Sequence, residues 1–270
     1  MVATNSVQPR TGNVSAGTSV FAMVVLERPL QKVYPEIDMV TTPAGAPVAM
    51  VHCNNCTADI DAWANLLLDF ARTAGLPLTK GEAFAALYNT ALHGDDDAGG
   101  LLSFNYLSGE SITGIKDGVP LLVRPRGSVL SFANFARNLL FSALSTLRIG
   151  MELLWQEQVA IDCLYGHGGF FKQAEAGSRM MAAATGSPVT VMQTADVGGP
   201  WGMALLAMYL LEGSGRTLPD WLDEAVFAAT EKTTTPPDKT DRADFDRYLT
   251  RYKAALGLEK AAEALLYGEE

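Results

Sequence analysis

Short apolar runs alternate with longer segments of helical periodicity along the chain. An apolar run of about 4–8 residues bounded by turn residues is typical of a buried strand. Such runs predict strands at Val20–Leu26, Pro47–Cys53, Leu101–Tyr106, Val119–Val123, Val159–Tyr165 and Pro188–Met192. Strands that alternate with helices form a sheet covered on one or both faces. The pattern therefore predicts an α/β architecture.

Between these runs, apolar residues recur every three or four positions. After Thr57, one face carries Ile60, Trp63, Ala64 and Leu67, and the start Thr79-Lys-Gly-Glu is a capping-box pattern. The predicted helices run, in chain order, over Thr57–Gly75, from Thr79 past Ala91, Ser128–Trp155, Lys172–Thr185, from Pro200 to Gly213, Leu218–Thr230 and Asp241–Tyr267. Thr233–Asp241, which reads TTTPPDKTD, predicts a break before the last, charged helix.

Two glycine-containing turns adjoin predicted strands. Gly17-Thr18-Ser19 leads into Val20–Leu26, and the GHGG sequence at 166–169 follows Val159–Tyr165. Ligands of open α/β sheets bind beyond strand ends, where turns meet helices. Glycine lets the backbone approach an anion, and amide and hydroxyl groups supply donors. Neither turn matches a P-loop or the full dinucleotide fingerprint. Each turn alone is also typical of an ordinary connection. As a pair on one sheet they leave open a nucleotide site, with phosphates at one turn and ribose or base at the other.

Composition removes two classes of partner. The 30 acidic and 20 basic residues give a net charge of −10, and the largest basic group is Arg124-Pro-Arg126. A nucleic-acid surface would need clustered Lys and Arg. The best membrane-span candidate, Leu139–Trp155, is interrupted by Arg148 and Glu152. The N-terminus lacks the pattern of a signal peptide, so we expect a cytoplasmic protein without nucleic-acid or membrane partners.

Two polar segments admit more than one interpretation. The segment HCNNC, residues 52–56, contains Cys53 and Cys56. It indicates either a redox or zinc site or a pair of semi-buried thiols at a strand-to-helix turn. Three cysteines in all favour a reducing compartment without a disulfide framework. The aspartates of His93–Gly100 indicate a solvated loop rather than a cation site, because the alternating ligands of an EF-hand are missing.

Five segments, in order, resemble the C-terminal domain of the FGGY carbohydrate kinases, whose fold is that of the actin-like, ribonuclease H-like ATPases. Ala16–Phe21 (AGTSVF) is similar to the second phosphate motif of the family. Asn105–Glu110 (NYLSGE) resembles the PYLSGER stretch of xylulokinase-like members. Asn134–Leu154 is similar to a family helix. Gly166–Val189 resembles the adenosine motif, and Gly198–Ala207 the small-residue helix after it.

The resemblance implies a mixed sheet flanked by helices and phosphorylation of a sugar hydroxyl by magnesium ATP. Its motifs place the β- and γ-phosphates near Gly17, Thr18 and Ser19. They place the nucleotide near Gly109, Gly168, Gly169 and Gln173, and the sugar beside Phe21. The NYLSGE segment favours a ketopentose such as xylulose or ribulose.

Parts of the family pattern are missing. The catalytic aspartate precedes the second phosphate motif in the family, whereas the first acidic residue here is Glu27. We therefore expect the general base, and an N-terminal kinase domain as partner, upstream of Met1. On this interpretation residues 1–232 form the nucleotide-binding domain, and 233–270 a linker with a helical tail packed on it. The chain alone would be inactive as a kinase, and a homodimer stays open.

Several residues near the candidate site also have a purely structural interpretation. Phe170 and Phe171, which replace small residues of the adenosine motif, are expected in the core or narrowing the base pocket. His167 is more typical of a turn than of a catalytic base, and Lys172 of a surface. Two other functions stay open: a non-catalytic kinase-like scaffold, and a thiol or metal protein that uses Cys53 and Cys56.

Overall fold

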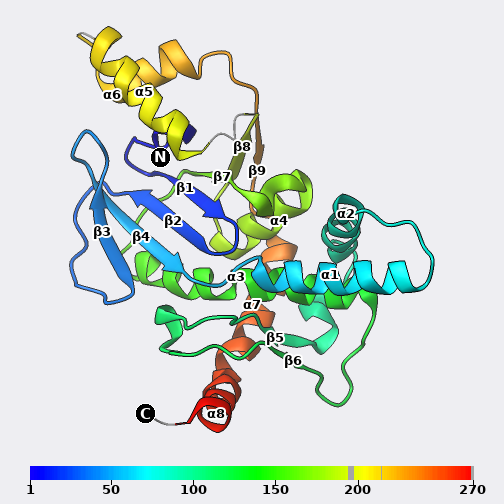
Figure 1. Ribbon diagram of the computed structural model, residues 1–270. Helices are drawn as coiled ribbons and strands as arrows, with labels where there is room; N and C mark the ends of the chain where they lie inside the picture. The colour runs from blue at the N-terminus through cyan, green and yellow to red at the C-terminus, as the bar shows by residue number, and fades with distance from the viewer. Residues whose placement is uncertain (194–197, 214, 269–270) are drawn as a thin grey trace.

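A mixed sheet of seven strands forms the centre of the molecule (Figure 1). The computed structural model describes residues 1–193, 198–213 and 215–268, and all structural statements refer to these. The strand order is β3-β4-β2-β1-β7-β8-β9. The strands are β1 (Thr11–Ala16), β2 (Val20–Val25), β3 (Ile37–Thr41), β4 (Pro47–Cys53), β7 (Cys163–His167), β8 (Val189–Met192) and β9 (Lys232–Thr235). The predicted pair at 101–123 forms a separate hairpin, β5 (Leu102–Phe104) and β6 (Leu121–Val123).

The strand directions bring the two glycine turns to one end of the sheet. β1 pairs antiparallel with β2 and parallel with β7, and Ser15 lies opposite His167. The β1–β2 turn and the segment after β7 therefore leave the sheet at the same edge. β7 and β8 are also parallel, and β9 returns antiparallel to β8. Parallel neighbours need a crossover connection, which α4 supplies between β7 and β8.

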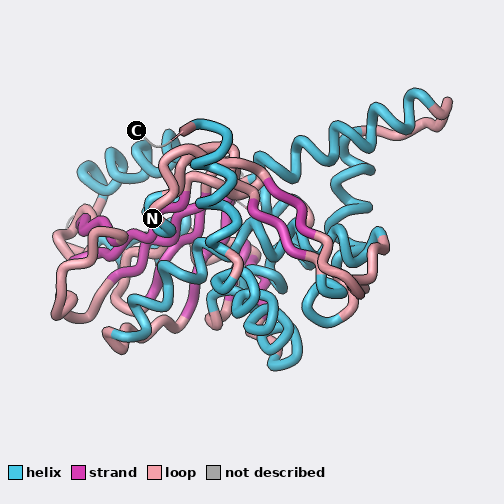
Figure 2. The backbone as a smooth tube through the Cα atoms, turned by 90° about the horizontal axis from the view of Figure 1, so that it is seen from below, coloured by secondary structure: helices cyan, strands magenta, loops and turns pink. Residues whose placement is uncertain are grey.

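Helices cover the sheet and surround α3 (Figure 1). The helices are α1 (Ala58–Thr73), α2 (Lys80–Ala91), α3 (Phe132–Gln156), α4 (Ala174–Thr185), α5 (Gly199–Glu212), α6 (Leu218–Trp221), α7 (Lys239–Ala254) and α8 (Leu256–Tyr267). α3 packs against β2 and β4 on one side and against β5 on the other. In both views α1 and its connection to α2 extend away from the sheet (Figure 2). Among these helices, none combines the length and apolarity needed to cross a membrane.

Two apolar clusters lie on opposite faces of the sheet. Leu164 belongs to the large cluster that contains α3 and α4, whereas its neighbour Tyr165 packs against the smaller cluster of α5 and α6. Successive side chains of a strand point to opposite faces, which explains the division. The smaller cluster includes Trp221, which is 1% exposed. Both faces of the sheet are thus covered at β7, which is one of the two arrangements that the predicted architecture allows.

Local signals in the sequence explain most of the helix starts. The Thr79 hydroxyl accepts a hydrogen bond from the Glu82 amide, and the Glu82 side chain accepts one from the Thr79 amide, which completes the capping box. Ser131 caps α3 by accepting from the Asn134 amide at 3.1 Å. α4 ends at Gly186, whose φ of +64° favours glycine.

Several predicted boundaries are wrong. β1 and β3 were not predicted as strands, and β7 begins four residues later than expected. The predicted helix Leu218–Thr230 ends its α-helical part at Trp221 and continues as a π-helical turn over Leu222–Val226. Thr233–Thr235, expected in a linker, belong to β9, because each residue pairs with β8. The proposed boundary after residue 232 therefore cuts an edge strand.

The C-terminal segment is two helices rather than one, since the chain bends between Ala254 and Leu256. α7 supplies Phe245, Tyr248 and Tyr252 to the large apolar cluster, each with 0% of its surface exposed. α7 is accordingly part of the core.

Candidate active site

The β1–β2 turn is a tight hairpin at the end of the sheet. The Gly17 amide donates to the Ser19 carbonyl at 2.8 Å. Gly17 and Ser19 are half-buried, and Thr18 is exposed. Within the described chain, the Thr18 and Ser19 hydroxyls make no hydrogen bond to protein groups. The turn therefore leaves two hydroxyl groups, one on the exposed Thr18 and one on the half-buried Ser19, without a partner among the described residues.

The start of α1 holds this turn in place. The Cys56 amide donates to the Thr18 carbonyl at 2.8 Å, and the Thr57 amide to the Gly17 carbonyl at 2.9 Å. Thr57 is the N-cap residue of α1. The first turn of a helix carries a partial positive charge and favours nearby anions. An anion at the hairpin would lie close to this helix end.

The glycine segment after β7 packs directly onto the hairpin. Gly168 has a φ of +98°, and a Cβ added there would lie 2.5 Å from the Ala16 carbonyl oxygen. Only glycine satisfies both the conformation and the close approach. Gly169 differs, because no atom lies within 4 Å of a Cβ added to it. Gly169 therefore faces open space.

A cavity of about 320 Å³ lies beside these two turns. It is bounded by the starts of α1 and α2 on one side and by the segment after β7 on the other. Its lining residues are Thr57, Asp61, Lys80, Gly81, Phe84, Tyr88, Gly169, Lys172 and Gln173. Two aromatic rings, two lysines and several polar groups thus surround one hollow. Such a mixture suits a ligand with a flat apolar part and negative charge.

The charged groups of the cavity are partly paired. The Lys80 ammonium group lies 3.2 Å from an Asp61 carboxylate oxygen and 5.6 Å from the centre of the Phe84 ring. Lys172 is exposed at the end of a 3₁₀ turn over Gly169–Lys172. Side-chain exposure of 60% for Lys80 leaves its charge accessible to a ligand.

The structure brings Gly169 and Gln173 into this cavity and places Gly17, Thr18 and Ser19 one hydrogen bond from its Thr57 edge. Gly168 does not line the cavity, and its Cα packs against the backbone of Ala16 at the start of the β1–β2 turn.

Gly109 and Phe21 lie elsewhere. Gly109 does not line the cavity, because its Cα packs against the backbone of Lys116 and its carbonyl accepts a hydrogen bond from the Asn54 side chain at 2.8 Å. Phe21 is half-buried on β2 and meets His52 edge-on, with ring centres 6.1 Å apart.

The expectation that Phe170 and Phe171 lie in the core is supported, whereas His167 lies in strand β7 rather than in a turn. Phe170 and Phe171 are 0% and 4% exposed, and neither lines the cavity. The Phe171 ring fills the space beside Gly166, and Phe170 packs edge-on against Tyr88. These rings therefore do not narrow the cavity from inside. Burial lowers the pKa of His167, which lies 3.2 Å from the Asn13 side-chain nitrogen, so the imidazole stays neutral.

Sequence reasoning missed the α1 and α2 side of the cavity. Phe84 and Tyr88 lie in the helix predicted to begin at Thr79, and Lys80 lies at its start. Their helical spacing was the available signal, and it is equally typical of core. Only the tertiary packing of α2 near α4 turns this face toward Gly169.

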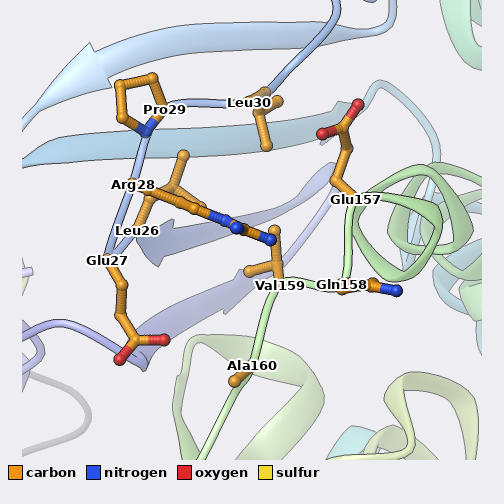
Figure 3. Close-up of a pocket in the computed structure, with 9 residues that line it drawn as sticks. All are labelled: Leu26, Glu27, Arg28, Pro29, Leu30, Glu157, Gln158, Val159 and Ala160. Atoms are coloured by element: carbon orange, nitrogen blue, oxygen red, sulfur yellow. The ribbon is translucent and has the colours of Figure 1, made fainter.

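A second hollow, at the opposite end of the sheet, is too small for an organic ligand. Its volume is about 20 Å³, enough for a water molecule. It lies between the loop after β2 and the end of α3, where the Glu157 carboxylate approaches the loop that carries Leu30 (Figure 3). Glu157 accepts hydrogen bonds from the Gln31 amide and the Tyr34 hydroxyl, both at 2.8 Å. This carboxylate ties the loop after β2 to the C-terminal end of α3.

The contacts of the two thiols and of the acidic loop are those of structural residues. Cys53 and Cys56 are buried, and burial raises the pKa of both thiols, so neither ionises near neutral pH. Asp97 of the acidic loop accepts a hydrogen bond from Arg251 at 2.9 Å. In the part of the chain that the structure describes, no group of three or more His, Cys, Asp or Glu is arranged to hold a metal ion.

Comparison with models of known families identifies the family of the chain. Residues 12–211 match the model of the C-terminal domain of the FGGY family of carbohydrate kinases. The chain belongs to this family. The match covers the hairpin, the segment after β7 and α5 up to Leu211, so the resemblance predicted from the sequence is confirmed. No curated protein sequence gives a significant match.

Solved FGGY kinases share the fold. Xylulose kinase from Rhodospirillum rubrum is 17% identical with a TM-score of 0.72, covering 97% of this chain and 50% of that one. Gluconate kinase from Lactobacillus acidophilus is 16% identical with a TM-score of 0.68, covering 96% and 49%. Plasmodium falciparum glycerol kinase with ADP is 11% identical with a TM-score of 0.66, covering 96% and 49%. The predicted actin-like ATPase fold is confirmed, and the chain spans about half the length of these kinases.

Proposed function

We propose that this chain is the ATP-binding half of a sugar kinase that transfers the γ-phosphate of ATP to a sugar hydroxyl. One observation carries the proposal. The β1–β2 hairpin and the glycines after β7 leave the sheet at the same edge, and a cavity lies beside them there. Family membership supports the same reaction class.

The residues present fit ATP. Gly169 leaves open space for a ribose or base, and the Phe84 and Tyr88 rings offer an apolar wall. The hydroxyls of Thr18 and Ser19 would donate to the β- and γ-phosphates beside the start of α1, while Gly17, whose amide donates to the Ser19 carbonyl, would shape the turn. Lys80 and Lys172 would add positive charge at the cavity mouth. Gln173 would hydrogen-bond the base.

Magnesium would arrive with the nucleotide. Mg²⁺ is commonly bound through substrate phosphates and retained waters rather than by a protein cage. When bound, the ion neutralises charge on the phosphates. The chain contributes the hairpin that orients them.

The base that deprotonates the sugar is proposed to come from an N-terminal kinase domain. Glu27, the first acidic residue, lies beyond the far end of β2 from the hairpin. Kinases of known structure that resemble the chain are twice its length, which supports a partner domain. We propose a ketopentose such as xylulose or ribulose as acceptor, on the NYLSGE segment; Phe21 would lie beside it.

Titration calorimetry of the chain with MgATP and with GTP tests the nucleotide site. We expect one site for MgATP in the micromolar range, with GTP weaker, because contacts to the base edge discriminate. Lack of binding at millimolar MgATP would contradict the proposal. Phosphoryl transfer from MgATP to xylulose, ribulose, gluconate and glycerol, assayed with the chain together with the proposed N-terminal domain, then identifies the acceptor.

A scaffold without catalysis is the second candidate. It is favoured by the apolar surface of α5, where Leu210 and Leu211 are each 84% exposed and Met203 is 68% exposed. Exposed apolar surface of this kind is typical of interaction sites. The same titration separates the two functions, since a scaffold would bind its partner and leave MgATP free.

A further inference from the structure

The loop after β5 carries a buried carboxylate that touches the start of α1. Glu110 has 0% of its surface exposed. Its Oε2 atom accepts the backbone amide of Asn54 at 2.9 Å and that of Asn55 at 3.3 Å. Burial raises the pKa of Glu110, while these amide hydrogen bonds oppose the shift. Burying a carboxylate costs stability unless it is hydrogen-bonded. The Oε1 atom of Glu110 is buried without a hydrogen-bond partner among the described residues, so the two amides that donate to Oε2 carry the contact.

Asn55 ties the same two segments together from the other side. It is 2% exposed, and its Oδ1 atom accepts the amides of Leu107 and Ser108 at 3.0 and 3.1 Å. Its Nδ2 atom donates to the Ser108 carbonyl at 3.0 Å. Asn105 adds a hydrogen bond to the Cys56 carbonyl at 3.1 Å. NYLSGE is thereby bonded along its length to residues 54–56.

The segment held in this way is the one that fixes the hairpin. Directly after Asn55, the Cys56 and Thr57 amides donate to the Thr18 and Gly17 carbonyls. Glu110 is therefore hydrogen-bonded to one end of segment 54–57, and the other end of the same segment is hydrogen-bonded to the turn at 17–19.

We propose that Glu110 and Asn55 are positioning residues for the phosphate turn: the NYLSGE loop acts on the nucleotide through the strand-to-helix segment 54–57, without touching it. The proposal rests on the proposed function of the turn. It gives the NYLSGE segment a role other than the direct approach expected of Gly109.

The physical reason is geometric. Groups that bind phosphate must be held to within about 0.5 Å to bind well. Without Glu110, the Asn54 and Asn55 amides lose a buried acceptor and the segment relaxes. The turn would move, whereas Gly169 and Phe84, which face the nucleoside, belong to other elements. Affinity for phosphate-bearing ligands should therefore fall more than affinity for adenosine.

The test compares Glu110→Ala, Glu110→Gln and a matched control, Glu157→Ala. Glu157 also accepts a backbone amide at 2.8 Å, but at the opposite end of the sheet (Figure 3). Dissociation constants of MgATP and adenosine are measured by calorimetry. Amide hydrogen exchange of Cys56 and Thr57 is followed in the free proteins.

For Glu110→Ala we expect MgATP to weaken about tenfold and adenosine less than about twofold. We expect faster exchange at Cys56 and Thr57, with α4 unchanged. Glu110→Gln, which keeps an acceptor oxygen, should recover most of the MgATP affinity. Glu157→Ala should leave the ratio of the two affinities at the wild-type value. If Glu110→Ala does not fold, Asn55→Ala takes its place as the variant that removes the contact, and Glu110→Gln stays the conservative comparison.

Equal weakening of MgATP and adenosine, or the same ratio in the Glu110 and Glu157 variants, would overturn the positioning role. Unchanged exchange at Cys56 and Thr57 would do so independently of any ligand. The two proposals fail in different ways: a wild-type chain that ignores MgATP contradicts the nucleotide site, while the exchange measurement still decides the role of Glu110.

Discussion

At the scale of single residues, two adjacent glycines serve different purposes. Gly168 is needed by the fold, because its φ is +98° and its Cα faces the Ala16 carbonyl. Gly169 has no such constraint. The adenosine-motif resemblance treats the two alike, and only the packed structure separates them.

Substitutions at these glycines should therefore diverge. Gly168→Ala places a side chain in a disfavoured backbone region and against a carbonyl, so it should lower the free energy of unfolding by about 2 kcal/mol or more. Gly169→Val should leave unfolding by urea unchanged and weaken MgATP at least about tenfold, because its side chain enters the cavity. Urea denaturation and calorimetry on both variants measure this. A Gly169→Val protein with wild-type affinity would place the nucleotide elsewhere.

At the scale of elements, the C-terminal helices are integral to the domain. Phe245 of α7 packs edge-on against Phe141 of α3, with ring centres 5.1 Å apart, and is fully buried. Phe245→Ala should lower the free energy of unfolding by about 3–5 kcal/mol. Leu265→Ala on α8, at a position 86% exposed, should change it by less than about 0.5 kcal/mol. Similar urea midpoints for the two variants would show that α7 is a loosely attached tail.

α8 also makes stability depend on pH. Burial raises the pKa of Glu259 to about 7, the nearby Glu263 carboxylate adds to the shift, and the Val119 amide, which donates at 2.7 Å, opposes it. Because the folded-state pKa lies above the unfolded value, the folded protein binds the proton more tightly. The stabilisation is complete below the unfolded pKa and is lost as pH rises through about 7.

Glu259→Gln removes this titration. Between pH 5 and 8 the variant should therefore gain stability relative to wild type, on the order of 1–3 kcal/mol. Glu157→Gln is the control: its contacts lower the pKa of Glu157, so the residue is ionised throughout this range and the difference from wild type should stay flat. Thermal unfolding from pH 5 to 8 measures both. A constant difference for Glu259→Gln would contradict the buried, proton-binding carboxyl.

The sequence predicted the elements that carry strong local signals. β2 is an unbroken apolar run, β4 is apolar except for His52, and the cap of α2 is a local hydrogen-bond pattern. The edge strands β3 and β9 were missed because most of their side chains are exposed and only one side pairs with the sheet. An edge strand made of Lys and Thr carries no apolar pattern to detect.

At the scale of the whole molecule, the candidate site joins parts far apart in sequence. The helix starts at Thr57 and Lys80 and the turn at Gly169 line one cavity, and the hairpin at 17–19 is hydrogen-bonded to the Thr57 edge of that cavity. The glycine turns could be predicted, because each lies next to a strand. The α1 and α2 contribution could not, since Phe84 and Tyr88 have the spacing of core residues. The site is a product of packing more than of motif.

The most direct test of the nucleotide site is its location on the folded chain. Hydrogen exchange of the wild-type protein, with and without saturating MgATP, should show slower exchange in peptides covering residues 15–20, 55–62 and 166–173. Peptides around the small hollow, at 26–31 and 157–161, should not change. Protection confined to any other part of the chain, or none at saturating MgATP, would contradict the account.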